Sequence, residues 1–161
     1  MGPSSLQTFE SKSESDTTKF GLALGQSLEA GTVIGLNGTL GAGKTRLTQA
    51  IGVGLGIPEG DVVSPTFTIC VPYEARLPLV HLDAYRIKSP EEVDELGLDE
   101  LAEDGAVLIV EWAERIEKYL PDMDIEISIK ADGENIRHFR FQVNSKLGES
   151  LMENVSKLVA G

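Results

Sequence analysis

The stretch GTLGAGKT, Gly38–Thr45, stands between an apolar run and a segment with helical periodicity. The run before it, Thr32–Asn37 (TVIGLN), has the length and composition of a buried strand. After it, apolar residues recur at Leu47, Ile51 and Leu55, which is the spacing of one face of a helix. The sequence therefore predicts a strand, a glycine-rich loop and a helix in succession, with a lysine where the helix begins.

This glycine loop has the features of a phosphate site. The first N–H groups of a helix have no intrahelical partner, and the helix dipole is positive at that end. Glycines ahead of the helix let successive amides point inward around a polyphosphate. Gly38, Gly43, Lys44 and Thr45 match the Walker A pattern G-x-x-x-x-G-K-[ST]. We expect Lys44 to reach the β- and γ-phosphates and Thr45 to hold Mg²⁺; the alternative is a glycine-rich turn followed by a solvated lysine.

A second metal contact is expected from the end of another buried strand. The run AVLIVEW, Ala106–Trp112, is apolar up to Glu111 and predicts a central strand. In open α/β sheets ligands bind at the carboxyl edge, where the carboxylate of Glu111 would lie. The alternative is an ordinary carboxylate at a strand end. Trp112, beside Glu111, would pack under the site or form a partner surface, and we expect core packing in preference to a partner surface.

The segment VHLDAYRI brings several polar residues together. In a strand, His81, Asp83 and Tyr85 share one face, which suggests a face that looks into a site. Asp83 would orient or deprotonate an attacking water, or hold a water on the metal. Arg86 would neutralise phosphate charge or pair with a carboxylate. The alternative is an edge strand with a solvated polar face.

Thr66 lies in the stretch SPTF, Ser64–Phe67, in the loop that follows the helix after the glycine loop. In nucleotide-binding proteins of this type, that region carries a residue that senses the γ-phosphate and the metal. Thr66 is therefore a candidate switch residue, and the alternative is a plain loop.

The rest of the chain alternates strands and helices, which indicates an α/β fold. We expect a single P-loop NTPase domain over residues 1–161, with three α/β/α layers, a mostly parallel central sheet and a C-terminal antiparallel hairpin. The other predicted elements are a strand at Leu6–Glu10, a helix at Asp16–Glu29 burying Phe20, Leu24 and Leu28, a hairpin from FTICVPYEA and LPLVHLDAYRI, short helices after Ser89, a short helix AERIEKYL, a hairpin from DIEISIKA and RHFRFQVN, and a last helix burying Leu147, Leu151, Val155, Leu158 and Val159.

Composition limits the partners. Fourteen basic and twenty-six acidic residues give a formal net charge of −12, so the surface repels nucleic acid unless a partner protein supplies the positive groove. The single cysteine, Cys70, lies in an apolar run and is expected to be a buried, unreactive thiol. No apolar run has membrane-spanning length, and the first residues do not resemble a signal peptide, so we expect a cytoplasmic protein without membrane contact.

The motifs GTLGAGKT, SPTF, HLDAYR and EW, in this order and near these spacings, resemble the TsaE (YjeE) family. This family contains the small bacterial P-loop ATPases of tRNA threonylcarbamoyladenosine (t6A) biosynthesis. The match spans about Leu6 to Trp112. The resemblance implies ATP and Mg²⁺ as cofactors and weak ATP hydrolysis that depends on TsaB and TsaD. It implies that TsaD modifies adenosine 37 of tRNA, that hydrolysis resets the complex, and that tRNA is contacted only through these partners.

The resemblance also assigns roles by position. It implies that Lys44, Asp83 and Glu111 are catalytic, with Asp83 needed for hydrolysis, and that Thr45 and Glu111 hold Mg²⁺. It places adenine near Thr17 and Thr18 and makes Thr66 the switch threonine. The residues that it places at the nucleotide are Gly41, Ala42, Gly43, Lys44, Thr45, Arg46 and Thr66.

Two other functions compete with a partner-dependent ATPase. The first is a small-molecule kinase in which Asp83 is the base for an acceptor hydroxyl and Arg86 clamps the phosphates. Such kinases usually carry an arginine-rich lid, and no basic cluster follows Trp112. The second is a nucleotide-binding module that does not hydrolyse ATP, in which Asp83 is only structural.

Overall fold

The computed structural model describes residues 8–39, 41–62 and 70–160. Its strands are β1 (Thr8–Ser11), β2 (Val33–Gly38), β3 (Cys70–Tyr73), β4 (Leu79–Asp83), β5 (Val107–Glu111), β6 (Ile125–Asp132) and β7 (Ile136–Val143). Its α-helices are α1 (Glu14–Ser27), α2 (Lys44–Gly54), α3 (Pro90–Asp94), α4 (Leu98–Glu103) and α5 (Lys146–Ala160). Short 3₁₀ turns follow β4 and β5: η1 (Ala84–Arg86), η2 (Ala113–Arg115) and η3 (Glu117–Tyr119). The predicted helix AERIEKYL is therefore two separate 3₁₀ turns.

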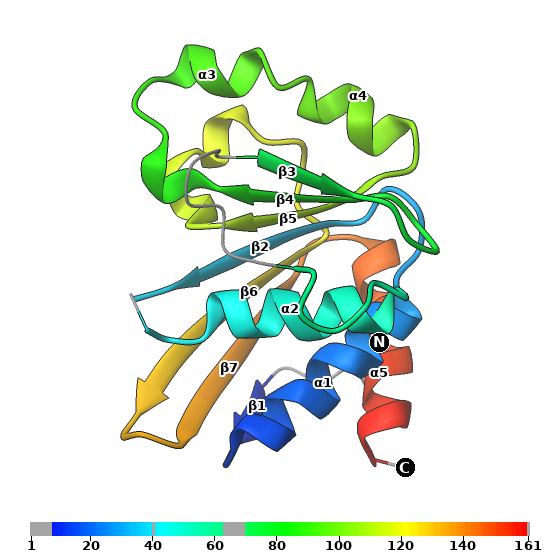
Figure 1. Cartoon of the computed structure of the whole chain (residues 1–161), viewed down its shortest axis with the longest axis vertical. Helices are drawn as coiled ribbons and strands as arrows, with labels where there is room; N and C mark the ends of the chain where they lie inside the picture. The colour runs from blue at the N-terminus through cyan, green and yellow to red at the C-terminus, as the bar shows by residue number, and fades with distance from the viewer. Residues whose placement is uncertain (1–7, 40, 63–69, 161) are drawn as a thin grey trace.

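The seven strands form one mixed sheet in the order β1-β7-β6-β2-β5-β4-β3 (Figure 1). The four central strands, β6, β2, β5 and β4, are parallel, and the pairs at both edges are antiparallel. Both predicted hairpins are confirmed, as β3–β4 and β6–β7. The expected parallel arrangement holds for the centre alone, because each edge is completed by a hairpin. The carboxyl ends of β2, β4 and β5 consequently meet at one edge.

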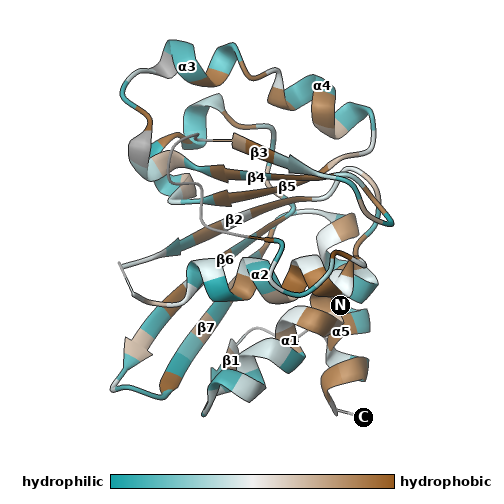
Figure 2. Cartoon of the chain, in the orientation of Figure 1, coloured by the Kyte–Doolittle hydropathy of each residue, from teal (hydrophilic) through white to brown (hydrophobic). Residues whose placement is uncertain are grey.

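Two apolar cores lie on the two faces of the sheet. One packs α1, α2 and α5 against the sheet, and the other lies between β2, β4 and β5 and the helices α3 and α4. Figure 2 shows β4 and β5 brown along most of their length, whereas β6 and β7 alternate between polar and apolar residues. On the second face, Ser128, Lys130 and Arg140 of these two strands are exposed. The three expected layers therefore cover only part of the sheet, because the outer face of β6 and β7 is polar and needs no cover.

The buried faces of the long helices follow the periodicity with one correction. Phe20, Leu24 and Leu28 are buried, as predicted. In α5, Leu151 and Val155 are buried together with Met152, and Leu147 is half-buried. The prediction was wrong for Leu158 and Val159, which are 51% and 38% exposed. Both residues line an open groove between the last turn of α5 and α1, so no sheet covers them there. Within the described ranges, no helix is long and apolar enough to cross a bilayer.

Glycines allow α1 and α2 to approach closely, which fixes the axis of the helix that begins at the glycine loop. A Cβ added at Gly25 would lie 2.2 Å from the carbonyl oxygen of Ile51 and 2.9 Å from the Cα of Gly54. Both obstacles are backbone atoms of α2, so the clash could be relieved only by moving one helix away from the other.

We expect Gly25→Ala to destabilise the protein by about 1–3 kcal/mol, the usual penalty of overpacking. This loss exceeds the gain of about 1 kcal/mol that alanine brings over glycine within a helix. The measurement is the midpoint of urea unfolding, compared with that of Gln26→Ala, an exposed neighbour in the same helix. An unchanged or raised midpoint in Gly25→Ala would contradict the tight packing of α1 on α2.

Candidate functional site

The glycine loop turns the chain from the end of β2 into the start of α2. Gly41 has φ 79° and Gly43, the N-cap of α2, has φ 109°, conformations that favour glycine. A Cβ at either position would meet nothing within 4 Å, so both glycines border open space. Leu47 donates its N–H to the Gly43 carbonyl at 3.0 Å. The N–H groups before Leu47, at the first turn of α2, are the ones that a helix leaves without intrahelical partners.

Lys44 is folded into this loop. Its Nζ donates to the carbonyl oxygens of Gly38 at 2.6 Å and Thr39 at 2.9 Å, and the residue is only 5% exposed. On its other side the ammonium lies 4.1 Å from the centre of the Trp112 ring. Such a cation–π contact offsets part of the solvation that the ammonium loses.

Burial lowers the pKa of Lys44 from its ordinary value, because desolvation disfavours the charged form. The nearby carboxylates of Glu111, Glu114 and Asp83 oppose this shift. An anion placed in the loop, where the lysine faces the carbonyls at present, would also oppose this lowering of the pKa. The ammonium of Lys44 is thus hydrogen-bonded to its own loop and lies near three acidic side chains.

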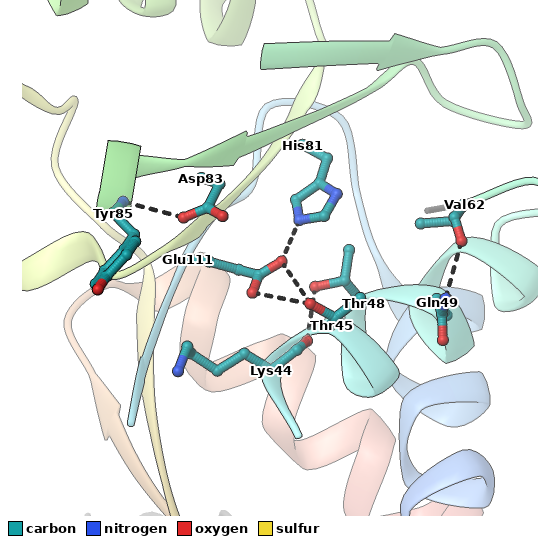
Figure 3. A network of polar contacts seen from close by, with 9 residues as sticks. All are labelled: Lys44, Thr45, Thr48, Gln49, Val62, His81, Asp83, Tyr85 and Glu111. Carbon is teal, nitrogen blue, oxygen red and sulfur yellow. Dashed lines mark hydrogen bonds and ion pairs between the residues drawn. The ribbon is translucent and has the colours of Figure 1, made fainter. Parts of the chain in front are cut away.

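Thr45 and Glu111 meet across the edge of the sheet (Figure 3). The Thr45 hydroxyl, in the first turn of α2, lies 3.2 Å and 3.4 Å from the two carboxylate oxygens of Glu111 at the end of β5. Glu111 is 4% exposed, and its Oε2 also contacts Nε2 of the fully buried His81 on β4. The structure therefore brings together both predicted metal ligands and adds a histidine, His81, in contact with the carboxylate.

The chemistry of these donors fits a magnesium ion. A hydroxyl and a carboxylate are the hard oxygen ligands that Mg²⁺ prefers, and the ion commonly takes one or two protein oxygens and completes its shell with water and phosphate. In residues 8–39, 41–62 and 70–160, no group of three or more His, Cys, Asp or Glu side chains could hold a metal ion. The pair of Thr45 and Glu111 matches a site that is completed by a ligand.

Asp83 ends β4 beside Glu111, with which it is in register. It is 9% exposed, and its Oδ1 accepts the backbone N–H of Tyr85 at 3.0 Å. The edge-strand alternative is wrong, because β3 lies outside β4 and because both His81 and Asp83 are buried.

The prediction that Tyr85 shares this face was also wrong. The chain leaves the extended conformation after Asp83, whose side chain caps the 3₁₀ turn η1, and Tyr85 is 47% exposed. Its ring centre lies 5.0 Å from that of Trp112 instead. A strand pattern places a residue on a face only while the strand continues, and here it stops two residues earlier.

Trp112 lies at the rim of the site and not wholly in the core. It is half-buried, packs partly against the second core, and presents its ring to Lys44 and Tyr85. Among the described residues other than glycine, Trp112 alone has a positive φ, 60°. This left-handed conformation is costly for a bulky side chain and is found where surrounding contacts impose it. The expected core packing therefore holds only in part, and the ring also packs at the site, the other role considered for it.

A cavity of about 240 Å³ lies beside the glycine loop, between the start of α1 and the β6–β7 turn. Gly41, Ala42, Gly43 and Arg46 line it, together with Thr17, whereas Thr18 lies in a different groove. Of the predicted nucleotide residues, Arg46 is exposed and forms an ion pair with Glu14 at 3.1 Å.

Arg137 also lines this cavity and was not found from the sequence. Its Nε donates to the Ala42 carbonyl at 3.1 Å, and its Nη1 donates to carbonyls of its own hairpin, Gly133 at 3.1 Å among them. One guanidinium thus ties the β6–β7 turn to the glycine loop. Since 95 residues separate Arg137 from Ala42, no local pattern could have indicated the contact.

Three predicted residues remain to be placed. Thr66 lies outside the described residues, and of Arg86 only the backbone is described, in η1. Cys70, in the edge strand β3, is half-buried and not fully buried. Burial raises the pKa of its thiol, which fits the expected low reactivity.

The fold and the site define an α/β protein with a strand–glycine loop–helix unit at the carboxyl edge of its sheet, where Lys44, Thr45 and Glu111 converge. The family model described as "Threonylcarbamoyl adenosine biosynthesis protein TsaE" matches residues 11–139, and the chain belongs to this family. The family takes part in tRNA threonylcarbamoyladenosine biosynthesis. The expected family resemblance is therefore confirmed.

Individual relatives support the same assignment. The "tRNA threonylcarbamoyladenosine biosynthesis protein TsaE" of Treponema pallidum is 41% identical over 125 residues, 76% of this chain and 92% of that protein. Its counterpart from Bacillus subtilis is 43% identical over 128 residues, 79% of each chain. The crystal structure of Bacillus subtilis YdiB matches with a TM-score of 0.77 and 33% identity, and the match covers 93% of both chains.

Proposed function

We propose that this protein is a P-loop ATPase that binds ATP with Mg²⁺ and hydrolyses it within the t6A-forming machinery. One observation carries the proposal: the Thr45 hydroxyl and the Glu111 carboxylate meet beside Lys44, at the N-terminal end of the helix that follows the glycine loop. This arrangement matches the Walker A lysine and hydroxyl together with an acidic residue from another strand.

Each residue then has a role in binding or catalysis. The amides of the glycine loop and of the first turn of α2 bind the phosphates, and Lys44 exchanges the carbonyls of Gly38 and Thr39 for phosphate oxygens. Thr45 and Glu111 hold Mg²⁺, which supplies charge neutralisation on the β- and γ-phosphates when bound. Asp83, next to Glu111 at the sheet edge, orients the attacking water or accepts its proton.

The partners in this proposal are proteins of the TsaB and TsaD type, in a cytoplasmic complex that forms t6A at position 37 of tRNA. The net charge of −12 supports indirect contact with tRNA, because a basic partner surface would hold the phosphate backbone. The proposal that the nucleotide is ATP rests on the resemblance to the TsaE family, and no contact to the base is part of the argument.

ATP hydrolysis is tested by release of inorganic phosphate with Mg²⁺, with and without TsaB and TsaD proteins from a related bacterium. We expect slow release alone and faster release with the partners. Release that ignores the partners but rises with an added nucleoside or sugar would favour the kinase. ATP binding without release under any condition would leave a non-hydrolysing module.

Trp112 gives an independent measurement of binding, because it is the only tryptophan of the chain. Its ring lies 4.1 Å from the ammonium of Lys44, which must turn toward a bound phosphate. We therefore expect a saturable change in tryptophan fluorescence on addition of ATP and Mg²⁺. The control is inorganic phosphate at the same ionic strength. If calorimetry detects ATP binding but the fluorescence of Trp112 stays unchanged, Lys44 does not move on binding.

A further inference from the structure

We propose that His81 is a positioning residue for the metal site: its Nε2–H holds the Glu111 carboxylate toward Thr45, and so sets the affinity for Mg²⁺. This inference rests on the proposed binding of ATP with Mg²⁺. His81 is fully buried on β4 and takes no other part in the proposed mechanism.

The two side chains come from neighbouring parallel strands. His81 is in register with Ile109, two residues before Glu111, so His81 and Glu111 project toward the same face of the sheet. Figure 3 shows the Glu111 carboxylate between the His81 ring and the Thr45 hydroxyl. One oxygen, Oε2, faces His81, while Thr45 lies within 3.4 Å of both oxygens.

The direction of this hydrogen bond follows from the other ring nitrogen. His81 Nδ1 is buried and has no hydrogen-bond partner among the described residues. An unpaired N–H is rarer in protein interiors than an unpaired acceptor, so Nδ1 is assigned as the acceptor nitrogen of the ring and Nε2 as the donor. The carboxylate therefore accepts from the histidine, as carboxylates that bind metals commonly accept from a neighbouring donor.

Glu111 needs a fixed hydrogen-bond partner because its carboxylate is also attracted to Lys44. The ammonium of Lys44 lies close enough to Glu111 for their charges to interact. The last torsion of a glutamate side chain has broad minima, so a Glu111 without a fixed partner is free to rotate. The His81 donor counteracts both effects and keeps the carboxylate facing the hydroxyl that would share the metal.

The experiment compares His81→Leu with His81→Gln. Leucine fills a similar volume without a donor, whereas the glutamine side-chain amide is able to replace the Nε2–H. The readouts are the apparent Kd for Mg²⁺ at saturating ADP, measured by Trp112 fluorescence, and Mn²⁺ binding followed by electron paramagnetic resonance. We expect His81→Leu to weaken metal binding about 10- to 100-fold, the usual loss of an outer-shell partner. ADP affinity in EDTA should stay unchanged, and His81→Gln should restore most of the metal affinity.

Other results would overturn the inference. A purely structural role predicts that His81→Leu weakens ADP binding by the same factor with and without Mg²⁺, or that His81→Gln is as impaired for metal as His81→Leu. Should His81→Leu fail to fold, His81→Asn replaces it, because its shorter amide does not reach Glu111; normal Mg²⁺ affinity in that variant would refute the role. A wild-type protein that binds no ADP at all would instead refute the proposed function.

Discussion

Replacing Lys44 by alanine is expected to weaken ATP binding roughly 10- to 100-fold and to eliminate hydrolysis. The estimate comes from about 1.5–3 kcal/mol for a hydrogen bond to a charged group. Lys44 is buried in the glycine loop, donates to two carbonyls of that loop and has a pKa lowered by desolvation. A bound phosphate would offset the desolvation of the ammonium, because it replaces neutral carbonyls with an anion.

Calorimetry with ATP and Mg²⁺ measures the loss in Lys44→Ala. The matched control is Lys118→Ala, which removes an exposed lysine from the turn η3. Normal ATP affinity in Lys44→Ala would reject the glycine loop as a phosphate site.

The wild-type affinity for ATP should also fall as the pH rises, because only the charged amine of Lys44 binds phosphate. The fall should begin below 10.5, the ordinary pKa of lysine, because burial lowers the pKa of Lys44.

Asp83→Asn is expected to keep ATP binding and to lose hydrolysis by about 10²- to 10⁴-fold, the usual contribution of a general acid or base. Asparagine retains the side-chain oxygen that caps η1 through the N–H of Tyr85, so the turn should survive the exchange. It lacks the negative charge that would orient or deprotonate water beside Glu111. The effect should therefore appear in kcat and not in the affinity for ATP.

Single-turnover phosphate release, in the presence of the partner proteins, measures the chemical step in Asp83→Asn. Asp94→Asn, an exposed change in α3, is the control for the loss of one negative charge. Wild-type turnover in Asp83→Asn would show that Asp83 only caps the turn. Loss of ATP binding in that variant would show that the residue acts through the structure of the site.

Local chemistry accounts for much of the site. Glycines where the chain needs positive φ, a lysine at the first turn and apolar periodicity on both sides are short-range features, so the strand, loop and helix around Gly43 could be predicted. The run that ends at Glu111 likewise marked the carboxyl edge of a buried strand. The contact of Thr45 with Glu111 was expected because ligands gather at that edge of a parallel sheet.

The remaining features depend on which strands lie side by side, and periodicity does not encode that order. A two-residue repeat placed His81 on a face but could not say that its ring contacts the carboxylate of Glu111, which is 30 residues away on the neighbouring strand. The contact of Arg137 with Ala42 required β6 to pair with β2 and so to bring the hairpin beside the glycine loop. Trp112 contacts Lys44 because its own backbone is left-handed directly after β5. Nearby contacts impose this conformation, which a bulky side chain disfavours. Hydrogen bonds and ring contacts between distant segments arise only once the whole sheet has assembled, whereas turns and helix starts are already favoured by the residues that form them.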